Sequence, residues 1–206
     1  NMSGCKRENL TGNPVRTQFI STKMDEEIFS LPFKTGRKCL IFGGSQGAVK
    51  LNDFIEDSYG WFSEHNIQII HVLGDRDYRK KYKESNYHVV KNENQEVIRV
   101  EVRFINDMKQ AYSWADRVIS RAGGTSIAEL VYYEKTALLV PFSFATDNHQ
   151  YYNARIYCSA GYGHVVSESK MSVEVLETFF KTDFKPQGAL FSYAGSWKSK
   201  LDGLIS

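Results

Sequence analysis

Residues 39–48 read CLIFGGSQGA, a short apolar run followed by a glycine-rich turn. A run in which nearly every residue is apolar gives a strand with two apolar faces, which is typical of a strand buried inside a parallel sheet. A helix is predicted to follow over residues 48–64, because the apolar residues of that segment recur on one helical face, at Leu51, Phe54, Ile55 and Phe62. The stretch therefore predicts a strand, a tight turn and a helix in succession.

The same alternation continues along the rest of the chain. Further short apolar runs occur at residues 67–73, 87–90, 98–102, 118–120, 137–140 and 164–166. Helices are expected at 107–115, 125–133 and 148–160, and two more are expected to begin at Ser172 and Gly188. Strands that alternate with helices favour right-handed βαβ units. We therefore predict one α/β domain over residues 37–206, a Rossmann-like doubly wound parallel sheet.

Residues 1–36 are polar and irregular and are interrupted by glycine and proline. We expect them to form a linker or entry segment that continues from a missing N-terminal domain.

Composition narrows the possible functions. The net charge of +2 gives no strongly basic face, so nucleic acid is not an expected partner. No apolar run approaches the roughly 18 residues of a membrane-spanning helix. The three cysteines are far apart and include no C-x-x-C pair, which favours a reducing cytoplasm over a disulfide framework or a zinc site.

In a doubly wound sheet, ligands bind beyond the carboxyl ends of the strands. The turn after residue 42 carries glycines and Ser45, which suit close approach to a phosphate. Residues 120–129, SRAGGTSIAE, place two glycines before a helix that Thr125 or Ser126 would cap, with Glu129 about one turn inside. Residues 146–150, TDNHQ, place amides and an imidazole at a helix start, with Asp147 as its expected cap.

Each of these strand ends, taken alone, fits a simple turn or a capped helix as well as a ligand site. Three of them at one edge of one sheet favour a nucleotide-sugar site. A dinucleotide-binding Rossmann enzyme is disfavoured because the chain lacks G-x-G-x-x-G.

Five segments in order carry a family resemblance: 11–16 (TGNPVR), 43–48 (GGSQGA), 104–108 (FINDM), 121–129 and 147–154. Together they resemble the C-terminal half of the bacterial MurG family, the undecaprenyl-diphospho-muramoyl-pentapeptide β-N-acetylglucosaminyltransferases. The resemblance implies the donor-binding half of a GT-B glycosyltransferase that holds UDP-N-acetylglucosamine (UDP-GlcNAc).

The resemblance also implies roles for individual residues. Arg16 would approach the uridine and the backbone of Ile105 would read the uracil, while Glu129 would bind the ribose hydroxyls. The diphosphate would lie against the loop of Ser45 and Gln46 and against the helix start at Gly124, Thr125 and Ser126. Gln150, with His149 beside it, would hold the sugar; the family commonly has glutamine where His149 stands.

The implied reaction is inverting transfer of GlcNAc to a lipid-linked N-acetylmuramoyl pentapeptide in peptidoglycan synthesis. No catalytic base is assigned to this chain, because the family's acceptor half, with its G-x-G-G-H loop, is not in this sequence. We expect the chain to be inactive alone and the full protein to be cytoplasmic and peripheral at the inner face of the plasma membrane. Alternatives are the donor-binding subunit of a two-component GlcNAc transferase and a nucleotide-sugar-binding module without turnover.

A metal ion is not expected, and neither is any other cofactor. Asp75 and Asp77 form the D-x-D pattern of metal-dependent glycosyltransferases, but they open a segment that reads as a solvated helix. The dipole of the helix that starts near Thr125 already suits a diphosphate.

Overall fold

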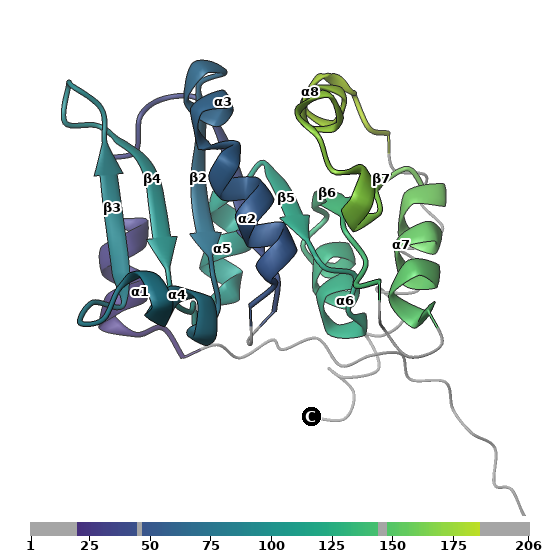
Figure 1. The fold of residues 1–206 in the computed structure, drawn as a ribbon, viewed down its shortest axis with the longest axis horizontal. Helices are drawn as coiled ribbons and strands as arrows, with labels where there is room; N and C mark the ends of the chain where they lie inside the picture. The colour runs from purple at the N-terminus through teal and green to yellow at the C-terminus, as the bar shows by residue number, and fades with distance from the viewer. Residues whose placement is uncertain (1–19, 45–46, 144–147, 186–206) are drawn as a thin grey trace, which may run out of the picture.

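The computed structural model describes residues 20–44, 47–143 and 148–185, so the predicted helix from Gly188 and the cap at Asp147 lie outside the described residues. Figure 1 shows strands in a row with helices packed along them. The strands are β1 (Arg37–Phe42), β2 (Ile67–Val72), β3 (Tyr87–Lys91), β4 (Val97–Val102), β5 (Arg117–Ser120), β6 (Thr136–Leu139) and β7 (Gly163–Val165). The helices are α1 (Lys23–Phe29), α2 (Val49–Asp57), α3 (Tyr59–Glu64), α4 (Asp75–Lys81), α5 (Met108–Trp114), α6 (Gly124–Tyr132), α7 (His149–Ser159) and α8 (Val173–Lys181), with a 3-10 turn η2 at Glu168–Lys170.

All seven predicted strands are present and form one sheet in the order β3-β4-β2-β1-β5-β6-β7. The order reverses at β1, which pairs with β2 on one side and β5 on the other, both in parallel. The prediction of a parallel sheet holds except at one edge, where β3 pairs antiparallel with β4. Only a short turn at residues 92–96 joins these two strands, and a parallel pair would need a crossover of a dozen or more residues.

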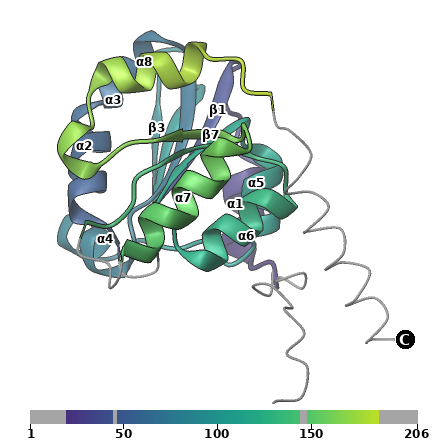
Figure 2. The ribbon, with the colours of Figure 1, turned by 90° about the vertical axis from the view of Figure 1, so that its right-hand side faces the viewer.

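Helices cover both faces of the sheet (Figure 2). Along β1, Cys39 and Ile41 face one core while Leu40 and Phe42 face the other, as the two-residue repeat of a strand requires. The first core packs against apolar residues of α2, α3 and α8, namely Leu51, Ile55, Phe62, Leu176, Phe179 and Phe180. The second packs against α1, α5, α6 and α7 through Ile28, Tyr112, Leu130, Ala154 and Tyr157.

Three helices differ from the sequence prediction. The helix expected over 48–64 is broken into α2 and α3 at Ser58, whose hydroxyl donates to the carbonyl of Phe54 at 2.8 Å. Helix α1 lies in the segment for which no regular element was predicted, and its Ile28 is fully buried. Helix α6 begins at Gly124 with Gly123 as its N-cap, so neither Thr125 nor Ser126 caps it as expected.

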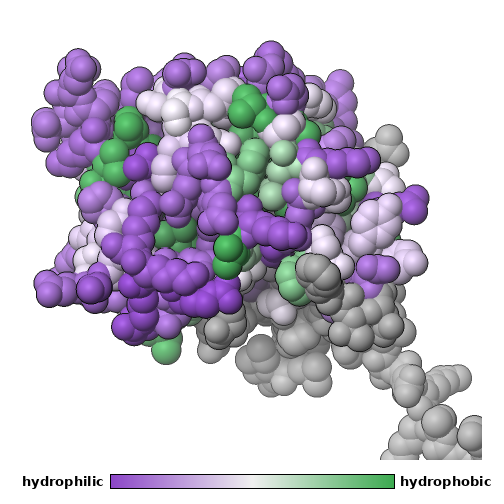
Figure 3. Space-filling model, viewed as in Figure 1, coloured by the Kyte–Doolittle hydropathy of each residue, from purple (hydrophilic) through white to green (hydrophobic). Residues whose placement is uncertain are grey.

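The surface in the view of Figure 1 is mostly hydrophilic, with hydrophobic residues in small groups (Figure 3). Within the described ranges, no helix has the length and apolar character needed to cross a bilayer.

Candidate functional site

Two of the cavities at the carboxyl edge of the sheet, where ligands bind in this architecture, are bordered by the loop after β1. The first, called here the Glu129 cavity, measures about 290 Å³ and is lined by Phe42, Gly44, Val72, Gly74, Arg103, Phe104, Ile105, Asn106, Met108, Thr125, Ser126 and Glu129. The second, the Gln150 cavity, measures about 610 Å³ and is lined by Gly43, Gly47, Ala48, Val49, Lys50, Arg76, Arg121, Phe142, Gln150 and Glu168. The loop after β1 borders both cavities, and the segments that follow β2 and β5 contribute residues to each, so one elongated ligand could occupy the two together.

Glu129 places a carboxylate at the wall of the first cavity. Its side chain is 7% exposed, and the hydroxyl of Tyr112 on α5 donates to its Oε2 at 3.0 Å. Burial, and then the negative charge of Glu129, raise the pKa of Tyr112 well above its usual value. Tyr112 therefore keeps its proton and remains a donor at neutral pH. The hydrogen bond orients the carboxylate as an acceptor, which suits a ligand with adjacent hydroxyl groups.

The N-terminus of α6 borders the same cavity through Thr125 and Ser126. Its first hydrogen-bonded turn begins with the amide of Ile127 donating to the carbonyl of Gly123 at 2.9 Å, and no side chain among the described residues caps it. Helix N-termini present amide groups and the positive end of the helix dipole. Gly123 adds no side chain to block approach. This end of α6 is suited to an anion such as a phosphate.

Ile105 lies in the loop between β4 and α5, and its side chain is buried. The amide of the next residue, Asn106, donates to the Oδ1 of Asp25 at 3.2 Å. Asp25 is fully buried and also forms the capping box of α1 with Thr22. Helix α1 therefore braces the backbone around Ile105. The T-x-x-D pattern of residues 22–25 could have revealed this helix start in the sequence.

The loop after β1 can follow its path only with glycine at position 47. Gly47 has a φ of 84°, and a Cβ there would lie 2.7 Å from the carbonyl oxygen of Leu73 and 2.8 Å from Oδ2 of Asp77. Gly44 also has a positive φ, 108°, but a Cβ there would meet no atom of the described residues within 4 Å. The backbone is thus packed tightly against α4 at Gly47 and is open toward the cavities at Gly44.

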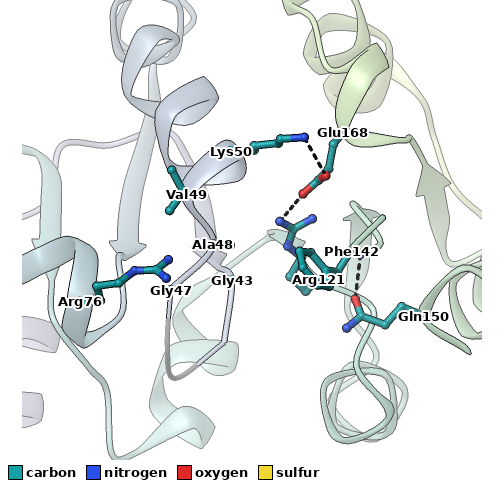
Figure 4. A pocket seen from close by; sticks show the side chains of 10 residues that line it. All are labelled: Gly43, Gly47, Ala48, Val49, Lys50, Arg76, Arg121, Phe142, Gln150 and Glu168. Atoms are coloured by element: carbon teal, nitrogen blue, oxygen red, sulfur yellow. Dashed lines mark hydrogen bonds and ion pairs between the residues drawn. The ribbon is translucent and has the colours of Figure 1, made fainter. Parts of the chain in front are cut away.

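Charged side chains surround the Gln150 cavity (Figure 4). Lys50, Arg76 and Arg121 come from α2, α4 and the end of β5, and the carboxylate of Glu168 lies between Lys50 and Arg121. Arg121 Nη2 lies 2.5 Å from Glu168 Oε1, and Lys50 Nζ lies 3.6 Å from Glu168 Oε2. Burial alone would raise the pKa of Glu168, but hydrogen bonds from Arg121 and Ser143 lower it below its ordinary value. Glu168 is therefore ionised at neutral pH.

Gln150 reaches this cavity from the first turn of α7. The backbone amide of Phe142 donates to its Oε1 at 3.0 Å, which fixes the orientation of the side-chain amide. His149 is exposed at the start of α7 and does not line either cavity. Gln150 and His149 were expected to act together, but only Gln150 lines the cavity.

Apart from His149, the predicted site residues are distributed as follows. Four line the Glu129 cavity: Ile105, Thr125, Ser126 and Glu129. Gly124 is the first residue of α6 beside them, and Gln150 lines the neighbouring cavity. Arg16, Ser45 and Gln46 lie outside the described residues.

Sequence reasoning assigned no site role to Arg103, Arg121 or Glu168. Arg103 lines the Glu129 cavity and is paired with Asp75. No local pattern marks Arg121 and Glu168 as partners, because they are 47 residues apart and meet only through the strand order.

The D-x-D carboxylates are engaged by neighbouring side chains. Asp75 bonds to Arg79 and Arg103, and the hydrogen bond from Arg79 is the largest cause of its lowered pKa. Asp77 accepts from Arg76 at 3.0 Å and from Asn52 at 2.9 Å. Among the residues that the structure describes, no group of three or more His, Cys, Asp or Glu side chains is arranged to hold a metal ion.

Comparison with known proteins agrees with this architecture. Residues 38–199 match the model of the glycosyltransferase family 28 C-terminal domain. The UDP-N-acetylglucosamine–N-acetylmuramyl-(pentapeptide) pyrophosphoryl-undecaprenol N-acetylglucosamine transferase of Halothermothrix orenii is 35% identical over 167 residues, which cover 79% of this chain and 44% of that protein. The enzyme of the same name from Nitratidesulfovibrio vulgaris is 38% identical over 167 residues, covering 80% and 43%. The chain therefore spans less than half the length of these relatives.

Solved structures with the same fold also match this chain. The crystal structure of MurG from Acinetobacter baumannii matches with a TM-score of 0.58 and 29% identity, over 74% of this chain and 45% of that one. The solution structure of ALG13 shares the fold with a TM-score of 0.51 and 16% identity, over 74% of this chain and 89% of that one. With its doubly wound sheet and its match to the family model over residues 38–199, this chain belongs to the glycosyltransferase family 28 C-terminal domain family.

Proposed function

We propose that this chain binds UDP-GlcNAc as the donor half of an inverting glycosyltransferase. The observation that carries the proposal is the placement of Ile105, Ser126 and Glu129 around one cavity whose connecting loops also border the cavity of Gln150. The volumes of the two cavities, about 290 and 610 Å³, are those of small-molecule sites. A nucleotide and a sugar joined by a diphosphate would occupy both.

In this proposal each part of the donor has its own partners. The uracil lies against the backbone at Ile105, where Arg16 also approaches, and the ribose hydroxyls donate to Glu129. The diphosphate lies between the α6 N-terminus, from Gly124 to Ser126, and the loop that contains Ser45 and Gln46. The sugar lies in the Gln150 cavity against Gln150, with His149 beside that residue at the start of α7.

The reaction proposed for the full protein is transfer of GlcNAc to a lipid-linked N-acetylmuramoyl pentapeptide, which forms the peptidoglycan precursor. The names of the relatives that are 35% and 38% identical support that acceptor. UDP leaves as the sugar's anomeric carbon is attacked, and negative charge grows on the diphosphate. Preorganised donors at the α6 N-terminus would stabilise that charge, each lowering the barrier by about 3 kcal/mol.

The acceptor would bind to a second, N-terminal domain or to a partner subunit, and that half would carry the catalytic base. Residues 1–36 would then be the linker or entry segment, and residues 37–206 the UDP-sugar-binding domain. We propose a cytoplasmic full protein held peripherally at the inner face of the plasma membrane, where a lipid-linked acceptor lies.

Isothermal titration calorimetry of the 206-residue chain with UDP-GlcNAc, UDP-GalNAc, UDP-glucose and inorganic phosphate tests the proposal. We expect UDP-GlcNAc to bind more tightly than the other two nucleotide sugars, and all three to bind more tightly than phosphate. Affinity for every nucleotide sugar no better than that for phosphate would refute it.

A further inference from the structure

A buried ion pair at the rim of the Gln150 cavity has no role in the ligand contacts proposed above. Arg121 follows β5 and Glu168 lies in η2 after β7; their side chains are 7% and 8% exposed. Desolvation of two charges is costly, and a buried pair is weak evidence for added stability. The contacts of this pair point instead to the loop that follows β6.

Arg121 binds the start of that loop. Its Nη1 donates to the carbonyl oxygens of Val140 at 3.1 Å and Pro141 at 3.3 Å, while Nη2 donates to Glu168. Its guanidinium carbon also lies 5.4 Å from the centre of the Phe142 ring. A planar guanidinium held on several sides fixes the backbone it contacts more firmly than a single bond would.

Glu168 binds the same loop further along. Its Oε2 accepts from the hydroxyl of Ser143 at 2.9 Å, while its Oε1 accepts from Arg121 at 2.5 Å. The loop is therefore held directly at residue 143 and, through Arg121, at residues 140 and 141. Phe142, which lies between these anchor points, has little freedom to turn its amide.

The amide of Phe142 is the group that orients Gln150. It donates to Gln150 Oε1 at 3.0 Å, as Figure 4 shows by a dashed line. A backbone N–H can bind only the carbonyl end of the side-chain amide, so the NH2 end of Gln150 remains available to donate to a ligand in the cavity that it lines. Gln150 consequently offers a hydrogen-bond donor to the Gln150 cavity, and the ligand atom that it meets must be an acceptor, such as a sugar hydroxyl oxygen.

We propose that Glu168 is a positioning residue for sugar recognition, which acts through Arg121 and the Phe142 amide to fix Gln150 as a donor. The inference rests on the proposed function, since it concerns the sugar of the same nucleotide-sugar ligand. Glu168 itself does not contact the sugar. The alternative is that the pair only ties the ends of β5, β6 and β7 together.

The test is Glu168→Gln, which keeps the side-chain volume and removes the charge. Calorimetry of the full 206-residue chain should show affinity for UDP-GlcNAc reduced about tenfold, the effect of one hydrogen bond, with affinity for UDP changed less than twofold. The matched control is Glu174→Gln, which removes a carboxylate from exposed Glu174 on α8 and should leave both affinities unchanged. Circular dichroism and thermal melts show whether each variant is folded.

A double-mutant cycle separates positioning from direct contact. In a Gln150→Ala background, Glu168→Gln should cause no further loss of UDP-GlcNAc affinity, because the residue through which it acts is absent. An additive loss would overturn the proposal, since Glu168 would then contact the sugar itself. Equal losses for UDP and UDP-GlcNAc would also overturn it, in favour of the structural alternative.

Ser143→Ala gives a second route if Glu168→Gln fails to fold. It removes one anchor of the loop and leaves the ion pair intact, so UDP-GlcNAc affinity should fall by about twofold to fivefold with UDP unaffected. Unchanged binding in that variant would contradict the proposal. If the unmodified chain binds no UDP-GlcNAc, the proposed function fails and this inference with it; if it binds and the folded variants match it, only this inference fails.

Discussion

Acidification should destabilise this protein through His71, which is fully buried on β2. Its Nε2 lies 3.1 Å from Asn52 Oδ1 and its Nδ1 lies 2.8 Å from the hydroxyl of Tyr59. The amide nitrogen of Asn52 donates to the carbonyl of Leu73 and to Asp77, so Asn52 Oδ1 is an acceptor and the proton of neutral His71 lies on Nε2. Burial, followed by the charges of Lys81 and Arg99, lowers the pKa of His71 to about 3.

The sign and size of the effect follow from that pKa. The unfolded chain binds a proton at His71 below about pH 6.5 and the folded chain does not until about pH 3. The free energy of unfolding therefore falls as the pH drops below about 6.5. At higher pH, His71 is neutral in both the folded and the unfolded chain and has no such effect. Between pH 7.5 and pH 5 the loss is about 2 kcal/mol. The figure depends little on the folded pKa, because pH 5 lies well above it.

Urea denaturation at pH 7.5 and pH 5 measures this loss, with His71→Gln as the variant that cannot titrate. The free energy of unfolding of the variant should fall by about 2 kcal/mol less than that of the unmodified chain over the same range. His164→Gln, at an exposed position on β7, is the control and should keep the full pH dependence. Equal pH dependence in the unmodified chain and His71→Gln would refute the reasoning.

Three further predictions concern the site. Glu129→Gln should weaken UDP binding by about tenfold to a hundredfold and reduce the preference for UDP over 2′-deoxy-UDP, because hydrogen bonds to a carboxylate are worth about 1.5–3 kcal/mol. Gly47→Ala should lower the free energy of unfolding by more than Gly44→Ala does, because both have positive φ but, among the described residues, only Gly47 has atoms against its Cβ position; Gly44→Ala should cost about 1–2 kcal/mol. Asp25→Asn should reduce the affinity for UDP more than the affinity for pyrophosphate, because Asp25 holds the backbone beside Ile105 in place. Calorimetry measures the first and third, and urea denaturation the second.

Each of these has a contrary outcome. Equal weakening of UDP and 2′-deoxy-UDP by Glu129→Gln would place the carboxylate away from the ribose. Equal destabilisation by the two alanines would show that the contact between Gly47 and α4 is unimportant. If Asp25→Asn reduced the affinities for UDP and pyrophosphate equally, Asp25 would contribute only to the stability of the fold. The control is Glu26→Gln, at an exposed neighbouring position on α1.

The strands were predictable because each is a short apolar run between breakers, as residues 67–73 illustrate. The antiparallel position of β3 was missed because burial pattern does not specify strand direction; the short connection over residues 92–96 carried that information. Helix α1 was missed because only Ile28 of its seven residues is a fully buried apolar side chain, which leaves too little periodicity to detect. Its capping box at Thr22 and Asp25 was the available signal.

The site was predictable where one strand end carries its own chemistry, as the segment from Gly124 to Glu129 does. It was not predictable where function depends on residues that meet through the fold. Asp25 contacts Asn106 across 81 residues of sequence, and Arg121 meets Glu168 across 47. Such pairs carry no local pattern, and they become visible only when the strand order is known.

The central claim is that one nucleotide sugar spans the Glu129 and Gln150 cavities. Two-dimensional ¹H–¹⁵N NMR of the 206-residue chain, which detects backbone and side-chain amides, tests it most directly during titration with UDP and then with UDP-GlcNAc. UDP should shift the amides of Ile105 and residues 124–126 and leave the Gln150 side-chain amide unchanged, and UDP-GlcNAc should shift both sets. Shifts by UDP-GlcNAc at residues of only one cavity, or at neither, would contradict the account.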